Sequence, residues 1–358
     1  MKKHAELEGR TAVVLANTGT PGKPTPRAVR KYLSQFLMDR RIRPMGLVPW
    51  SLILHLCILP KRGKASAQKY RSIWTPEGSP LVATQEKLAR GLEAHFAAQG
   101  TPVTVRSAMS YGQPSLEAAI KQLKKAGAAR IVVLPLYPQA AFSTTGSVTD
   151  KAERAFRKSH FKGETVVVSD YHNHPVYLKA MAAAIRNAGY NPASDDRLLF
   201  SFHSVPLNDL EAGDNYELQV GASSLGIANE LGLDRRQWTI GYQCQFDKGR
   251  QWLKPFSRDT LKAWAENAGD ARVFIACPNF AIDCLETIYD IQQQFVPEYT
   301  ARKRDWELYG EAHDHDGEQP AYAPAATGEI VYVPCLNATK AHVKVLASVL
   351  EPHLGLGR

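Results

Sequence analysis

Short apolar runs alternate with amphipathic stretches along most of this chain. Continuous apolar runs predict buried strands, and apolar residues every three or four positions predict helices. In the first half the predicted strands are 11–17, 103–109, 130–137 and 165–171. In the second half they are 197–203, 237–243, 271–278 and 329–334. Helical stretches separate the strands, and this alternation is typical of parallel sheets with right-handed crossovers.

The two halves match most clearly around their third strands. Residues 130–148 (RIVVLPLYPQAAFSTTGSV) and 272–288 (RVFIACPNFAIDCLETI) both run from an arginine through an apolar strand into a loop and a helix. We therefore predict an α/β protein with two similar Rossmann-like domains, each a four-stranded parallel sheet flanked by helices, and an active-site cleft between them. The predicted domains span 1–175 and 176–335, and residues 336–358 form a terminal helix.

Composition narrows the class of protein. Hydrophobic residues make up 44% of the 358 positions and charged residues 22%, as in ordinary globular proteins. No apolar run is long enough to cross a bilayer, and the first ten residues lack a secretory signal, so we expect a cytoplasmic protein. The five cysteines include no CxxC pair, which favours reduced thiols over a disulfide framework or a structural zinc site.

The net charge of +9 is concentrated in residues 23–72, which hold twelve Lys or Arg side chains and a single acid, Asp39. Inside this basic region lies an apolar run at 46–60, GLVPWSLILHLCILP. Such a segment can face nucleic acid, a membrane surface or an anionic amphipathic ligand. No motif of a nucleic-acid reader is present, so we expect no nucleic-acid partner. We predict a lid at 36–64; the alternative is a solvated helix followed by a core helix.

One strand ends in a residue suited to chemistry. Residues 198–206 read LLFSFHSVP, so His203 stands where the strand stops, at the sheet edge where open α/β sheets bind ligands. Histidine moves protons near neutral pH and holds transition metals. A strand-end histidine with its polar atoms satisfied and no catalytic task is the more common alternative.

A carboxylate follows about eighty residues later. If a helix begins near 281–283, Glu286 lies one turn into it and Asp290 follows on the same face. Glu286 can simply complement the helix dipole. A histidine and a carboxylate facing one another across a pocket can instead accept protons and coordinate a divalent metal ion.

These residues stand within motifs that resemble the ferrochelatases, enzymes that insert Fe²⁺ into a porphyrin during haem synthesis. The resemblance covers nearly the whole chain. Its nine motifs, in order, are LANTGTP (15–21), YLSQFLMDRRI (32–42), GSPL (78–81), MSYGQPS (109–115), LPLYPQ (134–139), STTGS (143–147), SFHSVP (201–206), WLKPF (252–256) and CPNFAIDCLETIYDI (277–291).

The resemblance implies roles for individual residues. His203 matches the family's proton acceptor, metal ligand, or both, and Glu286 matches the glutamate opposite it. Asp290 continues an acidic line that conducts metal or protons, so the implied metal ligands are His203, Glu286 and Asp290. Gln294 stands where some members carry a third acid. Positions implied to contact the macrocycle or its carboxylates are Tyr111, Phe280, Trp252, Arg62, Ser79 and Asp283.

The implied partners are a porphyrin and ferrous iron, with iron as a substrate and no resident prosthetic group. Some family members carry a [2Fe–2S] cluster on cysteines near the C-terminus, but only Cys335 lies near this end, so we expect no cluster. The motif at 33–42 favours protoporphyrin IX, and coproporphyrin III stays open. The basic region suits propionates, and the run at 46–60 is expected to touch the macrocycle or the inner face of the membrane. The side of metal entry and the oligomeric state stay open.

Three alternatives are weighed against this interpretation. A chelatase that inserts cobalt or nickel into another tetrapyrrole would present more than one histidine, whereas only His203 matches a motif here. A non-catalytic porphyrin or haem carrier would bind porphyrin without inserting metal. A nucleotide-binding protein of two domains would carry a GxGxxG or P-loop motif, and neither follows a strand in this chain.

Overall fold

The computed structural model describes residues 10–243, 245, 247–267, 271–309 and 330–355. The chain divides into two compact units. The first unit comprises residues 1–176 and 337–358, and the second comprises residues 177–336. The C-terminal segment therefore groups with the first unit.

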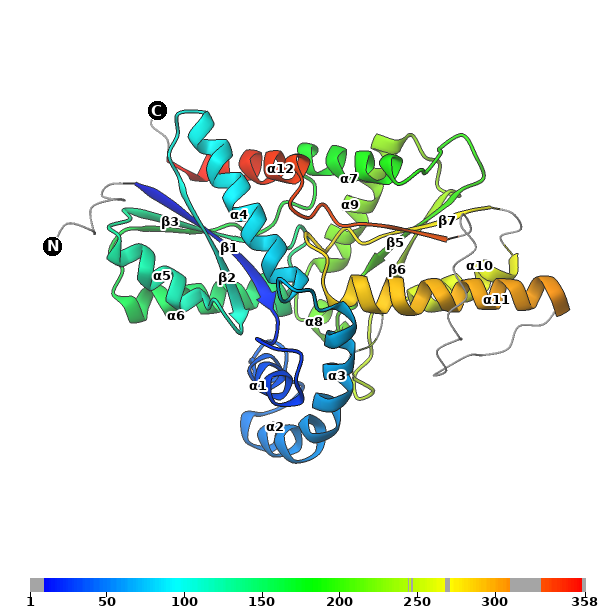
Figure 1. Ribbon diagram of the computed structural model, residues 1–358, viewed down its shortest axis with the longest axis horizontal. Helices are drawn as coiled ribbons and strands as arrows, with labels where there is room; N and C mark the ends of the chain where they lie inside the picture. The colour runs from blue at the N-terminus through cyan, green and yellow to red at the C-terminus, as the bar shows by residue number, and fades with distance from the viewer. Residues whose placement is uncertain (1–9, 244, 246, 268–270, 310–329, 356–358) are drawn as a thin grey trace. The chain divides into compact units, whose positions relative to one another are not determined.

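The first unit is built on a parallel sheet of four strands in the order β2-β1-β3-β4. Its strands are β1 (Thr11–Gly19), β2 (Thr104–Tyr111), β3 (Arg130–Pro135) and β4 (Glu164–Val167). Helices α4 (Pro80–Ala98) and α12 (Lys340–Leu350) cover one face, and α5 (Leu116–Lys125) and α6 (Ser147–Ser159) cover the other (Figure 1). Ala12, Val14 and Ala16 of β1 pack with residues of α5 and α6, as the period-two geometry of a strand requires.

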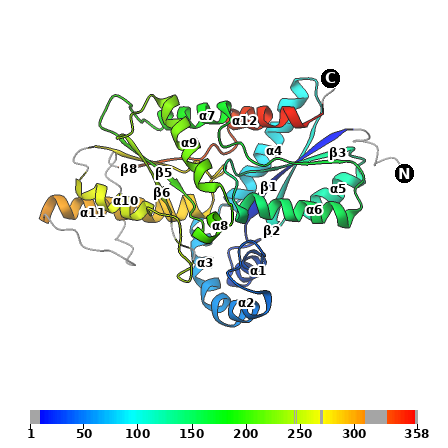
Figure 2. The ribbon, with the colours of Figure 1, turned by 180° about the vertical axis from the view of Figure 1, so that it is seen from behind.

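The second unit repeats this plan. Its sheet has the order β6-β5-β7-β8, with β5 (Arg197–Phe202), β6 (Trp238–Tyr242), β7 (Val273–Ala276) and β8 (Ile330–Val333), again all parallel. The flanking helices are α7 (Pro175–Asn187), α8 (Leu207–Glu211), α9 (Tyr216–Leu231), α10 (Ser257–Asn267) and α11 (Val296–Tyr309), seen from behind in Figure 2. The predicted fold class is confirmed: two similar α/β units with four-stranded parallel sheets.

The third strands of both units lead into π-helices, whose hydrogen bonds join residues five apart. After β3 comes η2 (Phe142–Gly146), and after β7 comes η3 (Glu286–Phe295). The expectation that the second helix begins near 281–283 is wrong, because Glu286 is the first residue of η3. Two hydrogen bonds of the Thr287 hydroxyl hold the preceding loop instead. The Cys284 N–H donates to Thr287 Oγ1 (3.0 Å), and that hydroxyl donates to Asp283 Oδ1 (3.0 Å).

The basic, apolar segment of the first unit forms α1 (Pro26–Leu37), α2 (Leu47–Ile53), the π-helix η1 (Leu54–Ile58) and α3 (Leu59–Ile73), beyond the carboxyl end of β1 (Figure 1). Trp50, Leu54 and Leu59 are buried. Most of the other large apolar side chains between residues 46 and 60 are not buried, and the most exposed of them are Val48 (70%) and Leu56 (72%). The alternative of a core helix is therefore wrong for most of this run.

Glycine is required at the last residue of β1, which lies against the end of β2. Gly19 has a φ of +108°, and a Cβ at this position would lie 1.9 Å from the carbonyl oxygen of Tyr111. Tyr32 of α1 donates its hydroxyl hydrogen to the Gly19 carbonyl (3.0 Å). The end of β1 thus packs directly on the residue that ends β2.

Among the described helices, none has both the length and the apolar composition of a membrane-crossing segment.

The terminal helix α12 begins with a cap and a buried histidine. Thr339 accepts a hydrogen bond from the His342 N–H (3.2 Å), and the short helix η4 (Glu351–His353) follows α12. His342 is 1% exposed, and its Nδ1 lies 2.5 Å from the Asn337 carbonyl oxygen. Burial lowers the pKa of His342 from 6.5 to about 4, because the charged imidazolium loses its hydration inside the protein.

The unfolding free energy should therefore fall as the pH drops from about 6.5 to 4. Above 6.5 the imidazole is neutral in both states and its contribution is complete; below that pH only the unfolded chain takes up the proton. The shift corresponds to a loss on the order of 3 kcal/mol. In urea titrations across this range, His342→Leu should flatten the slope, and His160→Asn, a change at an exposed position, should keep it. An unchanged slope in His342→Leu would contradict the assignment.

Candidate functional site

His203 directly follows β5, at the carboxyl edge of the second sheet. Its side chain is partly buried, and Nδ1 lies 2.6 Å from the carbonyl oxygen of Ser204. A carbonyl only accepts hydrogen bonds, so Nδ1 carries the proton in the neutral ring and Nε2 keeps a lone pair. An imidazole fixed in this tautomer can accept a proton or bind a metal ion through Nε2.

A buried tyrosine connects His203 to the loop after β7. The Tyr216 hydroxyl donates to the His203 carbonyl oxygen (2.9 Å), and Asn279 Nδ2 donates to the same hydroxyl (3.3 Å). Burial raises the pKa of Tyr216 well above its usual value, so the hydroxyl keeps its hydrogen. Because β5 and β7 are neighbouring parallel strands, the loops at their carboxyl ends lie side by side, and Tyr216 holds them together.

The loop that carries Trp252 is bound to the residues after His203. Ser204 Oγ donates to the Leu253 carbonyl oxygen (2.9 Å), and the Leu253 N–H donates to Val205 (3.0 Å). The Trp252 ring is only 6% exposed, and the guanidinium of Arg250 lies over it at 4.9 Å. Trp252 therefore packs within this loop and supports the segment that starts at His203.

The acidic residues of the predicted site lie on η3. Glu286, Asp290 and Gln294 are spaced by four and are partly buried. A turn of a π-helix holds more than four residues, so side chains at this spacing stay close to one face. Among the described residues, no three His, Cys, Asp or Glu side chains converge tightly enough to hold a metal ion.

Asp283 and Phe280 occupy structural positions in the same loop. Besides Thr287, the Tyr332 hydroxyl donates to Asp283 Oδ1 (2.5 Å), so this carboxylate ties the start of η3 to β8. Phe280 is partly buried and packs against the apolar cluster formed by β5, β7, α10 and η3. Their predicted contact with substrate stays a prediction.

Three predicted substrate contacts lie in the first unit. Arg62 is partly buried on α3, and Ser79 is buried at the N-cap position of α4. Tyr111 ends β2 and is buried, and burial raises its pKa. Its hydroxyl is occupied: it donates to Asp39 Oδ2 (2.8 Å) and lies 2.8 Å from Ser147 Oγ.

Asp39, the single acid of the basic region, joins that region to the sheet. It accepts hydrogen bonds from Tyr111, from Ser147 (2.7 Å) and from Lys151, whose ammonium also lies 4.3 Å from the centre of the Tyr111 ring. Burial alone would raise the pKa of Asp39, but the hydrogen bonds, led by Lys151, lower it to about 2. Arg41 adds two bonds to Asp150 of 2.8 Å each. The chain between α1 and α2 is thus fixed to α6.

Comparison with known proteins decides the family. A family model described as Ferrochelatase matches residues 10–309. The chain belongs to the ferrochelatase family. A ferrochelatase of Nitrosococcus oceani is 37% identical over 345 residues, which cover 96% of this chain and 87% of that protein. A ferrochelatase of Aeromonas hydrophila is 35% identical over 341 residues, with coverage of 95% and 98%. The predicted enzyme class, a porphyrin metal-inserting lyase, is confirmed.

Solved structures agree with this fold. SirB from Bacillus subtilis, solved with Fe³⁺, matches 97% of the chain with a TM-score of 0.54, and 96% of that protein is covered at 11% identity. The sirohydrochlorin chelatase SirB of Bacillus subtilis subspecies spizizenii, in complex with cobalt, has a TM-score of 0.51 over 96% of this chain and 95% of that one, at 10% identity. At these identities the likeness supports the architecture of this ferrochelatase and nothing finer.

Sequence reasoning missed the residues that position the site. Tyr216 and Asn279 hold the two loops together, yet neither follows a spacing that predicts this role. Asp39 carried a signal, because it is a lone acid among twelve basic residues. Its three side-chain partners, Tyr111, Ser147 and Lys151, could be found only in the folded protein.

Removing the Tyr216 hydroxyl tests whether the two loops depend on it. Tyr216→Phe leaves the buried His203 carbonyl and the Asn279 amide without this partner, at a cost of about 1–3 kcal/mol in unfolding free energy. We expect kcat for metal insertion to fall about tenfold, with KM for porphyrin changed less than threefold. Tyr190→Phe, which removes another buried hydroxyl of the second unit (3.3 Å from the Asp196 carbonyl), should lower stability only. Equal loss of kcat in both variants would contradict the positioning role.

Proposed function

We propose that this ferrochelatase inserts Fe²⁺ into protoporphyrin IX, with His203 as the base that removes the pyrrole protons. The observation that carries the proposal is the Nδ1 hydrogen bond to the Ser204 carbonyl, which leaves Nε2 as the acceptor. His203 also lies at the carboxyl end of β5, and open α/β sheets bind their ligands at the carboxyl ends of their strands.

A porphyrin presents a demanding reaction. Its four nitrogens lie in the ring plane, and two of them must lose protons before a divalent ion can enter. In the proposed mechanism His203 accepts one pyrrole proton through Nε2, releases it to solvent, and then accepts the second in the same way. Glu286 and Asp290 pass the partly dehydrated iron toward the ring, since carboxylates and imidazole both suit Fe²⁺. Binding energy from the rest of the macrocycle strains the ring out of its plane.

Glu286 occupies the first position of η3, where the helix dipole favours a negative charge. Asp290 and Gln294 follow at the same spacing, so the donor row changes from acid to amide along the helix. We infer that the incoming iron is bound by the carboxylates of Glu286 and Asp290. Gln294 offers the iron only the neutral oxygen of its amide. Phe280, Trp252, Tyr111, Arg62, Ser79 and Asp283 remain the proposed positions around the macrocycle and its carboxylates.

We also propose that the enzyme works without a resident [2Fe–2S] cluster. Such a cluster needs four thiolates. Burial raises the pKa of the thiols of Cys277, Cys284 and Cys335 in the second unit, which favours their protonated form. Cys57 lies in the first unit, and Cys244 lies outside the described residues.

A peripheral membrane contact of a cytoplasmic enzyme is the last part of the proposal. The apolar side chains exposed on α2 and η1 form a patch of Leu47, Val48, Leu52, Ile53 and Leu56. No acidic residue occurs between Asp39 and Glu77. An exposed apolar patch within a basic segment has the character of a surface that binds anionic lipid.

The catalytic proposal predicts a specific loss of metal insertion. His203→Ala should lower kcat by at least about a hundredfold, because general-base catalysis contributes about 10²–10⁴. Porphyrin affinity, measured by quenching of porphyrin fluorescence, should change less than threefold. The assay follows the anaerobic loss of free-porphyrin absorbance with Fe²⁺, with protoporphyrin IX and coproporphyrin III side by side. Glu286→Gln and Asp290→Asn should raise KM for iron more than that for porphyrin.

Three results would decide against parts of this proposal. Faster insertion into coproporphyrin III would reassign the substrate and keep the chemistry. Porphyrin binding without insertion in the unaltered protein would indicate a carrier. Full activity in His203→Ala, with His172→Ala as the matched control in the first unit, would remove His203 from the mechanism.

The membrane proposal predicts flotation with anionic vesicles. The protein should float with liposomes of phosphatidylcholine and phosphatidylglycerol at physiological salt, and less with phosphatidylcholine alone. Val48→Glu combined with Leu56→Glu should reduce binding to the vesicles at least about tenfold, because two apolar side chains that the membrane would bury are lost. Leu218→Glu changes a side chain that is 76% exposed on α9 and should have no effect. Absence of protein from the floated fraction would refute the membrane contact.

A further inference from the structure

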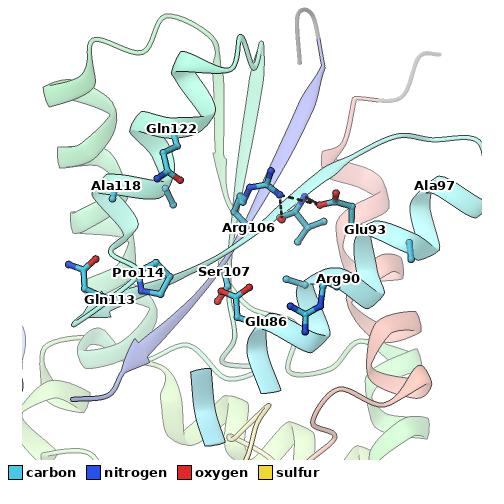
Figure 3. Close-up of a pocket in the computed structure, with 14 residues that line it drawn as sticks. Glu86, Arg90, Glu93, Ala97, Arg106, Ser107, Gln113, Pro114, Ala118 and Gln122 are labelled. Carbon is cyan, nitrogen blue, oxygen red and sulfur yellow. Dashed lines mark hydrogen bonds and ion pairs between the residues drawn. The ribbon is translucent and has the colours of Figure 1, made fainter. Parts of the chain in front are cut away.

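A groove follows the open edge of the first sheet. The strand order leaves β2 at this edge, and a cavity of about 770 Å³ lies along it. Residues 105–107 form its floor, α4 forms one wall and α5 the other (Figure 3). None of the residues assigned above to porphyrin or iron lines this groove.

The backbone of β2 turns alternate residues toward the groove. The Val105 N–H donates to Glu93 Oε2 (2.8 Å), and the Val105 carbonyl accepts from the Arg106 guanidinium (2.9 Å). Farther along, the Met109 N–H donates to the Pro114 carbonyl (2.7 Å). Residues two apart in a strand direct their backbone groups to the same side. Ser107 lies between these two residues, so its N–H and C=O also face outward, and no described group caps them.

The side chain of Ser107 gives a second, independent sign of a ligand. It is 6% exposed and lines the groove, yet its hydroxyl has no hydrogen-bond partner in the described part of the chain. A buried hydroxyl without a partner costs about 1–3 kcal/mol. A ligand in the groove that accepts or donates a hydrogen bond would remove this cost.

The walls of the groove are made of small side chains. Ala89, Ala94 and Ala97 come from α4, and Ala118 and Ala119 from α5, so a slot remains next to the strand. The rim is polar and carries both signs of charge, from Glu86, Arg90, Glu93 and Arg106 (Figure 3). An extended peptide has the matching chemistry: a backbone that both donates and accepts, small side chains for the slot and charged side chains for the rim.

We propose that this groove binds an extended peptide segment of a partner protein, which adds to the sheet as a fifth strand beside β2. The peptide carbonyl accepts from the Ser107 N–H, and the peptide N–H donates to the Ser107 carbonyl. The Glu93 and Arg106 side chains, 44% and 50% exposed, swing away and release Val105 for the next pair of bonds.

The depth of the edge favours a single strand over a second copy of this chain. Pairing of β2 with its counterpart in another copy would bring two further helices, α4 and α5 of that copy, against the same walls. A single extended segment needs only the slot. About 3.3 Å of strand per residue means that four or five peptide residues span the described floor and its ends.

The test selects a peptide and then blocks the groove. Random twelve-residue peptides displayed on phage are panned against the full chain, and the enriched sequence is synthesised with a fluorescent label for anisotropy titration. Ala94→Trp fills the slot from an exposed position of α4, and binding should weaken at least tenfold. Ala98→Trp, also exposed on α4 but outside the groove, should bind like the unaltered protein. Both variants should retain metal insertion and thermal stability.

Two further measurements identify the mode of binding. Ser107→Pro removes the outward N–H, which an edge strand tolerates, and should also weaken binding at least tenfold. Hydrogen exchange of the Ser107 amide should slow at least tenfold when the peptide binds. The proposal is overturned if no peptide is enriched, if Ala94→Trp binds as well as Ala98→Trp, or if the Ser107 amide is not protected. A dimer that Ala94→Trp dissociates would assign the groove to a second copy instead.

Discussion

The parallel pairing of the strands is the constraint on which this protein depends. In each sheet all four strands run parallel, so their carboxyl ends lie at the same end of the sheet and residues distant in sequence are carried there by the pairing of the backbone. His203 and Glu286 are 83 residues apart, and they follow two neighbouring strands of the second sheet. The loops at that edge must satisfy their own backbone groups, because the ladder has ended. Tyr216 does so for His203 by donating to its carbonyl.

The strands of both sheets and the position of His203 could be predicted from the sequence, because burial constrains the residues of a strand. Strands buried on both faces are continuous apolar runs, so 130–137 and 197–203 were visible by pattern alone, and the observed strands Arg130–Pro135 and Arg197–Phe202 lie within them. His203 could be placed because it stops such a run. The motifs then identified the family. Strands of this kind can be located from the sequence because a position buried on both faces of a sheet accepts few residue types other than apolar ones.

The rest depended on contacts between distant residues. The start of η3 was expected too early because the residues at 281–283 suit a helix, whereas Asp283 is bound by Thr287 and Tyr332. Residues 46–60 are apolar enough for a core, yet only their inward side chains, such as Trp50 and Leu54, are covered. The Tyr111 hydroxyl is engaged by Asp39 and Ser147, which no spacing in the sequence indicates, and the expected contact of its ring with the macrocycle stays a prediction. Composition cannot tell which side of a helix will find a neighbour.

The π-helical form of η3 has an evolutionary consequence. A π-turn holds about one residue more than an α-turn, so deleting a single residue within Glu286–Phe295 would return one of its turns to α-helical pitch and rotate the side chains before the deletion relative to those after it. The sheet and the loops around His203 would be unaffected. Under the proposed role of Glu286 and Asp290, descendants of this scaffold could thereby exchange the donors offered to an incoming ion, and with them the preferred metal, by a change of length and not of side-chain chemistry.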